Sequence, residues 1–167
     1  YYNGLPIWSN HVAFLIDLSG SMKEPVGGEG EGKERTKAEA ALQELIRTVG
    51  ALEKGQEFEI CLFQTEPFWW KKKLVPVNAQ AKQEAVKWLN GRKTPQHWSN
   101  YFDALVGTSQ IPGADTIFIL TDGEPSVGEY KRTDLMLEKY IELNRYRRVQ
   151  VHTIKIGVLE GDRAKQD

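Results

Sequence analysis

The chain has 167 residues, of which 40% are hydrophobic and 27% charged, and its formal net charge is −1. This length suits one domain with a core of its own. A charge so close to zero excludes a strong global attraction to nucleic acid or to an anionic membrane surface. The single cysteine, Cys61, excludes an internal disulfide and a cysteine-based zinc site. No apolar stretch reaches the length of a membrane-spanning helix.

Apolar residues recur along the chain in two alternating patterns. Short continuous apolar runs predict buried strands, and apolar residues three and four apart predict helices. In chain order we predict a strand over 12–16, a helix after Thr36, a strand over 58–63, an edge strand near 67–74, a helix after Asn78, a short helix over 99–105, a strand over 116–120, a helix over 134–145 and a strand over 149–156. This alternation indicates an α/β fold with a doubly wound, mostly parallel, Rossmann-like sheet of five visible strands.

Polar turns follow two of the predicted core strands. Asp17, Ser19 and Ser21 alternate after the first, and Asp122 follows the strand over 116–120. In doubly wound sheets, ligands bind beyond the carboxyl ends of the strands, where the strand order reverses. Oxygen ligands without His or Cys favour Mg²⁺, Mn²⁺ or Ca²⁺ over zinc and copper, so we predict a divalent-metal site. The plainer alternative is that Asp17 and Ser19 only cap their loop.

These turns carry a family resemblance. The run from Asp17 to Met22 resembles the D-x-S-G-S-M signature of von Willebrand factor A (VWA) domains, whose fold is shared with integrin I domains, and Thr121-Asp122-Gly123 resembles their later T-D-G turn. The resemblance spans roughly residues 12–157. It implies a metal-ion-dependent adhesion site (MIDAS) whose metal ligands are Asp17, Ser19, Ser21, Ser99 and Asp122. Ser99 stands where the family commonly has threonine, and it offers the same hydroxyl with a less fixed rotamer.

The resemblance also implies a function. In the family the hydroxyls contact the metal directly, and the ion keeps an open position that takes an Asp or Glu carboxylate from a protein partner. We therefore expect a metal-dependent protein–protein interaction and adhesion module with Mg²⁺ as cofactor, and Mn²⁺ or Ca²⁺ as alternatives. We expect no catalytic residues, no nucleic-acid partner and no membrane span in this segment.

An enzyme is the alternative from a different class. Metal-dependent phosphotransferases or phosphatases of the haloacid-dehalogenase-like type also place an aspartate after an apolar strand. They need a second acid two positions on, where this chain has Ser19, and no lysine or histidine lies in the first turn to manage a phosphoryl group. The run from Trp69 to Lys73 invites a nucleic-acid interpretation, but lysines on an edge strand explain it as well.

Two further expectations concern the edges of the domain. The Gly- and Glu-rich segment from Lys23 to Arg35 is read either as a solvated insertion or as a rim that selects partners, with Glu24 nearest the metal turn. The chain begins with Tyr1 rather than Met and ends soon after the last strand, where the family usually adds a helix. We therefore expect residues 1–167 to be a single VWA-like domain excised from a longer chain, with the C-terminal helix missing, and favour an extracytoplasmic location.

Overall fold

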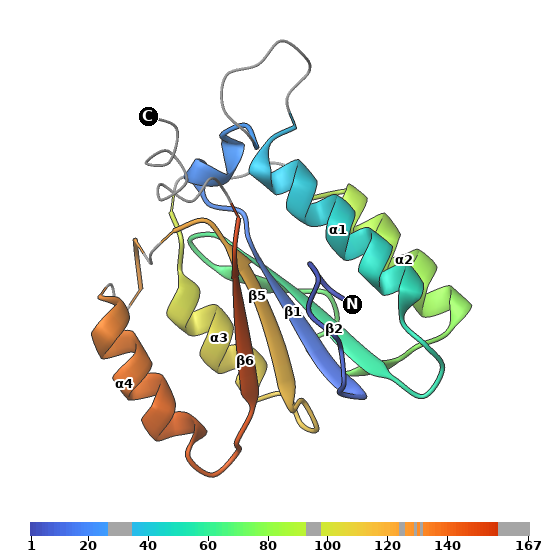
Figure 1. Ribbon diagram of the computed structural model, residues 1–167. Coiled ribbons are helices and arrows are strands. Elements are labelled where there is room, and N and C mark those ends of the chain that lie inside the picture. Colours follow the sequence, from blue (N-terminus) through green and yellow to red (C-terminus); the bar gives the residue numbers. More distant parts are fainter. Residues whose placement is uncertain (27–34, 93–97, 124–125, 129, 131, 157–167) are drawn as a thin grey trace, which may run out of the picture.

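The fold is a sheet with helices on both sides (Figure 1). A computed structural model describes residues 1–26, 35–92, 98–123, 126–128, 130 and 132–156. In chain order its elements are β1 (His11–Asp17), the 3₁₀ helix η1 (Gly20–Lys23), α1 (Lys37–Ala51), β2 (Glu57–Phe63), β3 (Pro67–Trp69), β4 (Val75–Pro76), α2 (Ala79–Asn90), α3 (Tyr101–Ser109), β5 (Thr116–Thr121), α4 (Thr133–Asn144) and β6 (Gln150–Lys155). The helices and the core strands lie close to the ranges predicted from the sequence.

The sheet is mixed and mostly parallel. Its strand order is β3-β2-β1-β5-β6, and β4 also pairs with β2. β1 is parallel to both β2 and β5, and β5 is parallel to β6, whereas β3 and β4 run antiparallel to β2. The doubly wound α/β prediction is confirmed.

The strand count differs from the expected five, because the predicted edge strand near 67–74 is a strand only at β3, over its first residues, and a further short strand, β4, follows it. The cause is Glu59, a fully buried residue of β2. Its carboxylate accepts hydrogen bonds from the backbone amides of Lys71 (3.1 Å) and Lys73 (2.9 Å). These bonds draw the chain out of strand geometry between β3 and β4, so the sheet has six strands.

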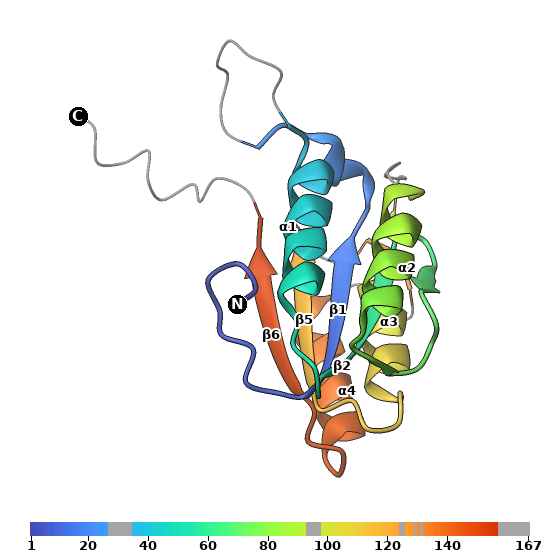
Figure 2. The same ribbon diagram turned by 90° about the vertical axis from the view of Figure 1, so that its right-hand side faces the viewer.

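The two faces of the sheet are covered by different helices. α1 and α2 pack on one face, and α3 and α4 on the other (Figures 1 and 2). Along β1 the side chains alternate accordingly, with Phe14 and Ile16 under α1 and α2, and Ala13 and Leu15 under α3. From β1 the chain winds outward to β2 on one side and to β5 and β6 on the other. The strand order therefore reverses at β1, and sheets of this kind bind ligands at the carboxyl ends of the strands beside such a point.

The N-terminal segment covers part of the α1 face. Asn3 and Gly4 have positive φ angles of 47° and 80°, and Tyr2 and Leu5 exchange backbone hydrogen bonds across this tight turn. The turn places the fully buried Tyr2 ring edge-on against Phe14 (5.1 Å between centroids) and Phe118 (5.8 Å).

The described residues include no helix that is long and apolar enough to cross a membrane. The expectation that a C-terminal helix is missing concerns residues 157–167, which lie outside the described residues.

Candidate metal centre

The predicted turns meet at one edge of the sheet, the upper edge in Figure 1. β1 and β5 are in parallel register, with Ile16 opposite Leu120, so Asp17 and Asp122 follow neighbouring strand ends. The hydroxyls of Ser19 and Ser21 lie 3.2 Å apart, and the Ser21 hydroxyl donates to Asp122 Oδ1 at 2.7 Å. The Ser99 hydroxyl donates to Asp17 Oδ2 at 3.2 Å. The structure thus brings together all five residues that the sequence predicted as metal ligands.

Asp17 is the buried anchor of this cluster, with 1% of its surface exposed. Its Oδ1 accepts from the Ser19 backbone amide at 2.8 Å, and its Oδ2 accepts from the Thr121 hydroxyl at 2.6 Å as well as from Ser99. Burial raises the pKa of the Asp17 carboxyl, and the hydrogen bonds from Thr121 and Ser19 only partly offset this. The carboxylate is therefore desolvated and fixed in one orientation by its donors.

Apolar anchors hold the first turn in shape. Leu18 and Met22 flank the two serines and are almost completely buried. The Leu18 amide bonds to the Phe63 carbonyl at 2.9 Å, and the Met22 amide to the Ser19 carbonyl at 3.1 Å, which starts η1. Because the Leu18 and Met22 side chains point into the core, the hydroxyls of Ser19 and Ser21 lie at the edge of the sheet.

Ser99 reaches the cluster from the segment just before α3. Its backbone amide donates to the Ser126 hydroxyl at 2.8 Å, and its carbonyl accepts from the Ser126 amide at 3.0 Å. The next residue, Asn100, caps α3 with its side chain. Its backbone amide donates a hydrogen bond to the Gln64 carbonyl at 2.6 Å. Ser99, with 3% of its surface exposed, is thus fixed between the loops that follow β2 and β5.

Sequence reasoning missed a cation in the cluster. The Lys37 ammonium donates to Asp122 Oδ2 at 2.9 Å and to Glu24 Oε2 at 2.6 Å. Burial lowers the pKa of Lys37, but the hydrogen bonds and charges of Glu24 and Asp122 outweigh it, so the pKa is raised. A signal existed: Lys37 is the first residue of α1, where the helix dipole disfavours positive charge. A lysine there points to a specific acidic partner.

The donor set fits a hard divalent cation. It consists of two carboxylates and three hydroxyls, and the described part of the chain holds no cluster of three or more His, Cys, Asp or Glu side chains suited to a metal. Oxygen-only donors match Mg²⁺, Mn²⁺ and Ca²⁺. The ammonium group on Asp122 is an independent sign that positive charge is stabilised at this spot.

The Gly- and Glu-rich segment begins next to the cluster. The Val26 amide bonds to the Arg35 carbonyl at 2.8 Å, Pro25 forms a β-bridge with Thr36, and the Lys37 amide bonds to the Glu24 carbonyl at 2.8 Å. These contacts form a paired stem, and Glu24 touches the cluster through Lys37, as its position in the sequence predicted. Residues 27–34 lie outside the described residues.

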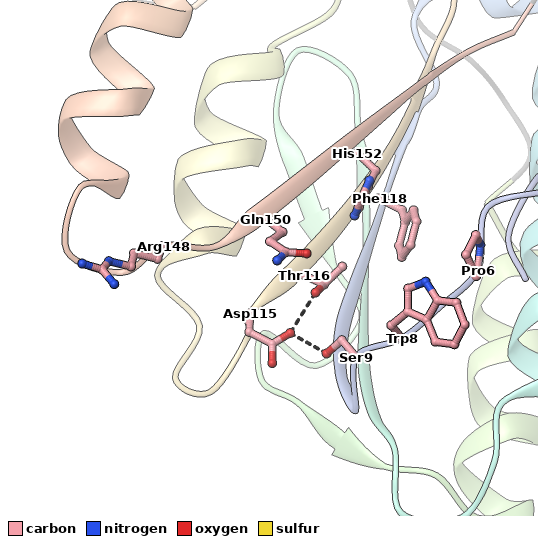
Figure 3. A pocket seen from close by; sticks show the side chains of 9 residues that line it. All are labelled: Pro6, Trp8, Ser9, Asp115, Thr116, Phe118, Arg148, Gln150 and His152. Atoms are coloured by element: carbon pink, nitrogen blue, oxygen red, sulfur yellow. Dashed lines mark hydrogen bonds between the residues drawn. The ribbon is translucent and has the colours of Figure 1, made fainter.

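A separate hollow of about 320 Å³ opens between the N-terminal segment and the starts of β5 and β6 (Figure 3). Trp8 and Phe118 line it, and Asp115 on its rim accepts a hydrogen bond from Thr116 at 2.9 Å. The exposed His152 stacks on Phe118 with 4.9 Å between ring centroids. The oxygen cluster is not part of this hollow.

Known proteins share the sequence pattern. The profile of the von Willebrand factor type A domain matches residues 10–165. Inter-alpha-trypsin inhibitor heavy chain H1 from Mesocricetus auratus is 28% identical over 139 residues, which is 77% of this chain, and heavy chain H3 from Bos taurus is 31% identical over 138 residues, 75% of this chain. The chain spans 14% of the length of each of these relatives.

Solved structures share the fold. A von Willebrand factor type A protein from Catenulispora acidiphila superposes with a TM-score of 0.63 at 20% identity, over 80% of this chain and 30% of that one. An aerotolerance-related membrane protein from Bacteroides fragilis superposes with a TM-score of 0.58 at 16% identity, over 89% of this chain and 68% of that one. At such identities the likeness concerns the fold alone. Because the family profile covers nearly the whole chain, the chain belongs to the von Willebrand factor type A domains, which are generally protein-interaction modules rather than enzymes.

Proposed function

We propose that this domain binds Mg²⁺, or Mn²⁺ or Ca²⁺ in its place, and through it a carboxylate group of a protein partner. The ligands would be Asp17, Ser19, Ser21, Ser99 and Asp122, a metal-ion-dependent adhesion site. The observation that carries the proposal is the convergence of these five oxygen-bearing side chains, from three separate loops, into one hydrogen-bonded cluster at the carboxyl ends of β1 and β5.

The charge of the cluster supports an acidic partner. A divalent ion would supply two positive charges, and the two carboxylates formally balance them, while the three hydroxyls add no charge. Asp17 already accepts hydrogen bonds from Ser19, Ser99 and Thr121. The positive ends of these donors offset part of the negative charge that its carboxylate would present to the ion. Such an ion stays electrophilic and favours one more hard anionic oxygen, which an Asp or Glu side chain provides.

A phosphotransferase has less support. The position two residues after Asp17, where such enzymes carry a general acid, is Ser19. The Lys37 ammonium already pairs with the carboxylates of Glu24 and Asp122. We also propose an extracytoplasmic location, because the aerotolerance-related protein from Bacteroides fragilis that shares the fold is a membrane protein.

Isothermal titration of the purified domain with Mg²⁺, Mn²⁺ and Ca²⁺ tests the metal. We expect a single site whose affinity falls at least tenfold in Asp17→Asn. The matched control is Asp115→Asn, which makes the same change at an aspartate on the opposite edge of the sheet, bonded to Ser9 and Thr116. Unchanged affinity in Asp17→Asn, or an equal loss in Asp115→Asn, would show that the ion binds elsewhere.

Selection from a random peptide display library tests the partner chemistry. In Mg²⁺ we expect enrichment of peptides that share an Asp or Glu, and their binding should disappear in EDTA and when that acid is changed to Asn or Gln. Peptides retained equally well in EDTA would contradict a contact through the metal, even if the metal itself binds.

A further inference from the structure

Both carboxylate oxygens of Asp122 are already engaged by the chain's own residues. The Ser21 hydroxyl occupies Oδ1 and the Lys37 ammonium occupies Oδ2. The side chain of Asp122 is 3% exposed and that of Lys37 is 13% exposed, so their ion pair is largely shielded from water. An ion that uses Asp122, directly or through water, has to share one of these oxygens or displace its present partner.

The position of Lys37 is fixed by more than its charge. Its backbone amide bonds to the Glu24 carbonyl in the paired stem, and the Thr36 capping box starts α1 immediately before it. The ammonium then bridges Asp122 to Glu24, whose side chain is 64% exposed. If the Lys37 ammonium leaves Asp122, it can therefore remain paired with the more exposed carboxylate of Glu24.

We propose that Lys37 is a built-in counter-cation of the metal centre, which neutralises Asp122 in the metal-free protein and competes with the divalent ion for it. The inference rests on the proposed metal site and adds a regulator to it. Lys37 weakens metal binding because a positive charge stands beside the ion's position, and it stabilises the metal-free protein because Asp122 is not left buried without a cation.

The test compares Lys37→Met, which removes the charge and keeps the aliphatic stem, with Lys23→Met. Lys23 is the exposed last residue of η1, two positions after Ser21, and it forms no ion pair with another of the described residues. Titration calorimetry with Mg²⁺ and Mn²⁺ measures the affinity, and thermal melting in EDTA measures the stability of the metal-free form.

We expect Lys37→Met to bind the ion about tenfold more tightly than the unmodified protein, the effect of one unit charge a few ångströms from a divalent ion in a partly solvated site. In EDTA the same variant should melt at a lower temperature, and saturating Mg²⁺ should raise its melting temperature by more than it raises that of the unmodified protein. Lys23→Met should change neither quantity to a comparable extent.

Equal or weaker metal binding in a folded Lys37→Met would overturn the inference and leave the metal site standing; weaker binding would mean that Lys37 positions Asp122 for the ion. If the Lys37→Met protein does not fold, Lys37→Gln replaces it in the same comparison. Absence of binding in the unmodified protein and in both variants would overturn the metal site and the inference together.

Discussion

At the scale of single residues, Asp17 is the group on which the site depends most. Two hydroxyls converge on its Oδ2, and the bond from Thr121 (2.6 Å) is shorter than that from Ser99 (3.2 Å). Thr121 belongs to β5 and is itself buried, so its hydroxyl is held by the sheet rather than by a loop. Thr121 is therefore a positioning residue: it fixes the carboxylate that the proposed ion needs.

We expect Thr121→Val to lower the free energy of unfolding in EDTA by about 1–3 kcal/mol, because an isosteric change leaves a buried carboxylate short of one donor. Urea denaturation measures this. The control is Thr116→Val at the other end of β5, where the hydroxyl donates to the half-exposed Asp115, and the loss should stay below about 1 kcal/mol. Equal losses in both variants would mean that the Asp17 contact has no special weight.

The sequence predicted the oxygen ligands but not their supporting residues, and the reason is physical. Asp17, Ser19 and Ser21 stand in one turn, where spacing alone indicates convergence. Lys37 meets Asp122 across 85 positions of the chain. The lysine at the start of a helix indicates an acidic partner, but which acid it meets depends on where the helix start and a strand end come together in space.

At the scale of elements, the short strands at the β2 edge depend on one acidic side chain. Glu59 stands in the apolar run of β2 and is fully buried, and burial raises the pKa of its carboxyl. Backbone amides of Ile60, Lys71 and Lys73 bond to it. Composition indicated an edge strand rich in lysine here. A lone acidic side chain inside a buried strand needs hydrogen-bond donors, and here the backbone of the neighbouring segment supplies them.

We expect Glu59→Gln to destabilise the protein by about 1–3 kcal/mol, because one carboxylate oxygen becomes an NH₂ group that faces amide donors instead of accepting from them. The control is Glu57→Gln at the partly exposed start of the same strand. Hydrogen exchange of the Lys71 and Lys73 amides should accelerate in the first variant only. Unchanged exchange there would contradict the role assigned to Glu59.

At the scale of the whole molecule, we expect the fold not to depend on the proposed ion. The core beneath α1 and α2 and the core beneath α3 and α4 are each continuous, and the N-terminal Tyr2 closes part of the first. The candidate metal centre lies at one edge of the sheet, where the Lys37 ammonium pairs with the Asp122 carboxylate. Binding of an ion should therefore add stability by mass action without creating the fold.

We expect EDTA to leave the far-ultraviolet circular dichroism spectrum at 25 °C unchanged and saturating Mg²⁺ to raise the melting temperature. Loss of helical signal in EDTA would instead make the ion a structural requirement, as in small zinc domains. The Asp17→Asn variant is the control, because its melting temperature should not respond to Mg²⁺.

The N-terminal turn allows a second test of the whole fold. The Tyr2 ring packs against Phe14 of β1 and Phe118 of β5, whereas its hydroxyl is buried and has no hydrogen-bond partner in the described part of the chain. Tyr2→Phe should therefore be neutral or slightly stabilising, and Tyr2→Ala should cost about 3–5 kcal/mol for the lost ring. Thermal melting distinguishes the two. A loss of more than about 1 kcal/mol in Tyr2→Phe would reveal a polar partner for the hydroxyl.

The paired stem at Glu24, Pro25, Val26, Arg35 and Thr36 has a practical consequence. Since the stem holds both ends of the intervening segment together, the entropy of closing that segment grows only slowly with its length. Residues 27–34 are thus a natural place for sequence drift between related proteins and for engineered insertions. A peptide library inserted between the two strands of the stem would be joined to the domain next to the candidate metal centre.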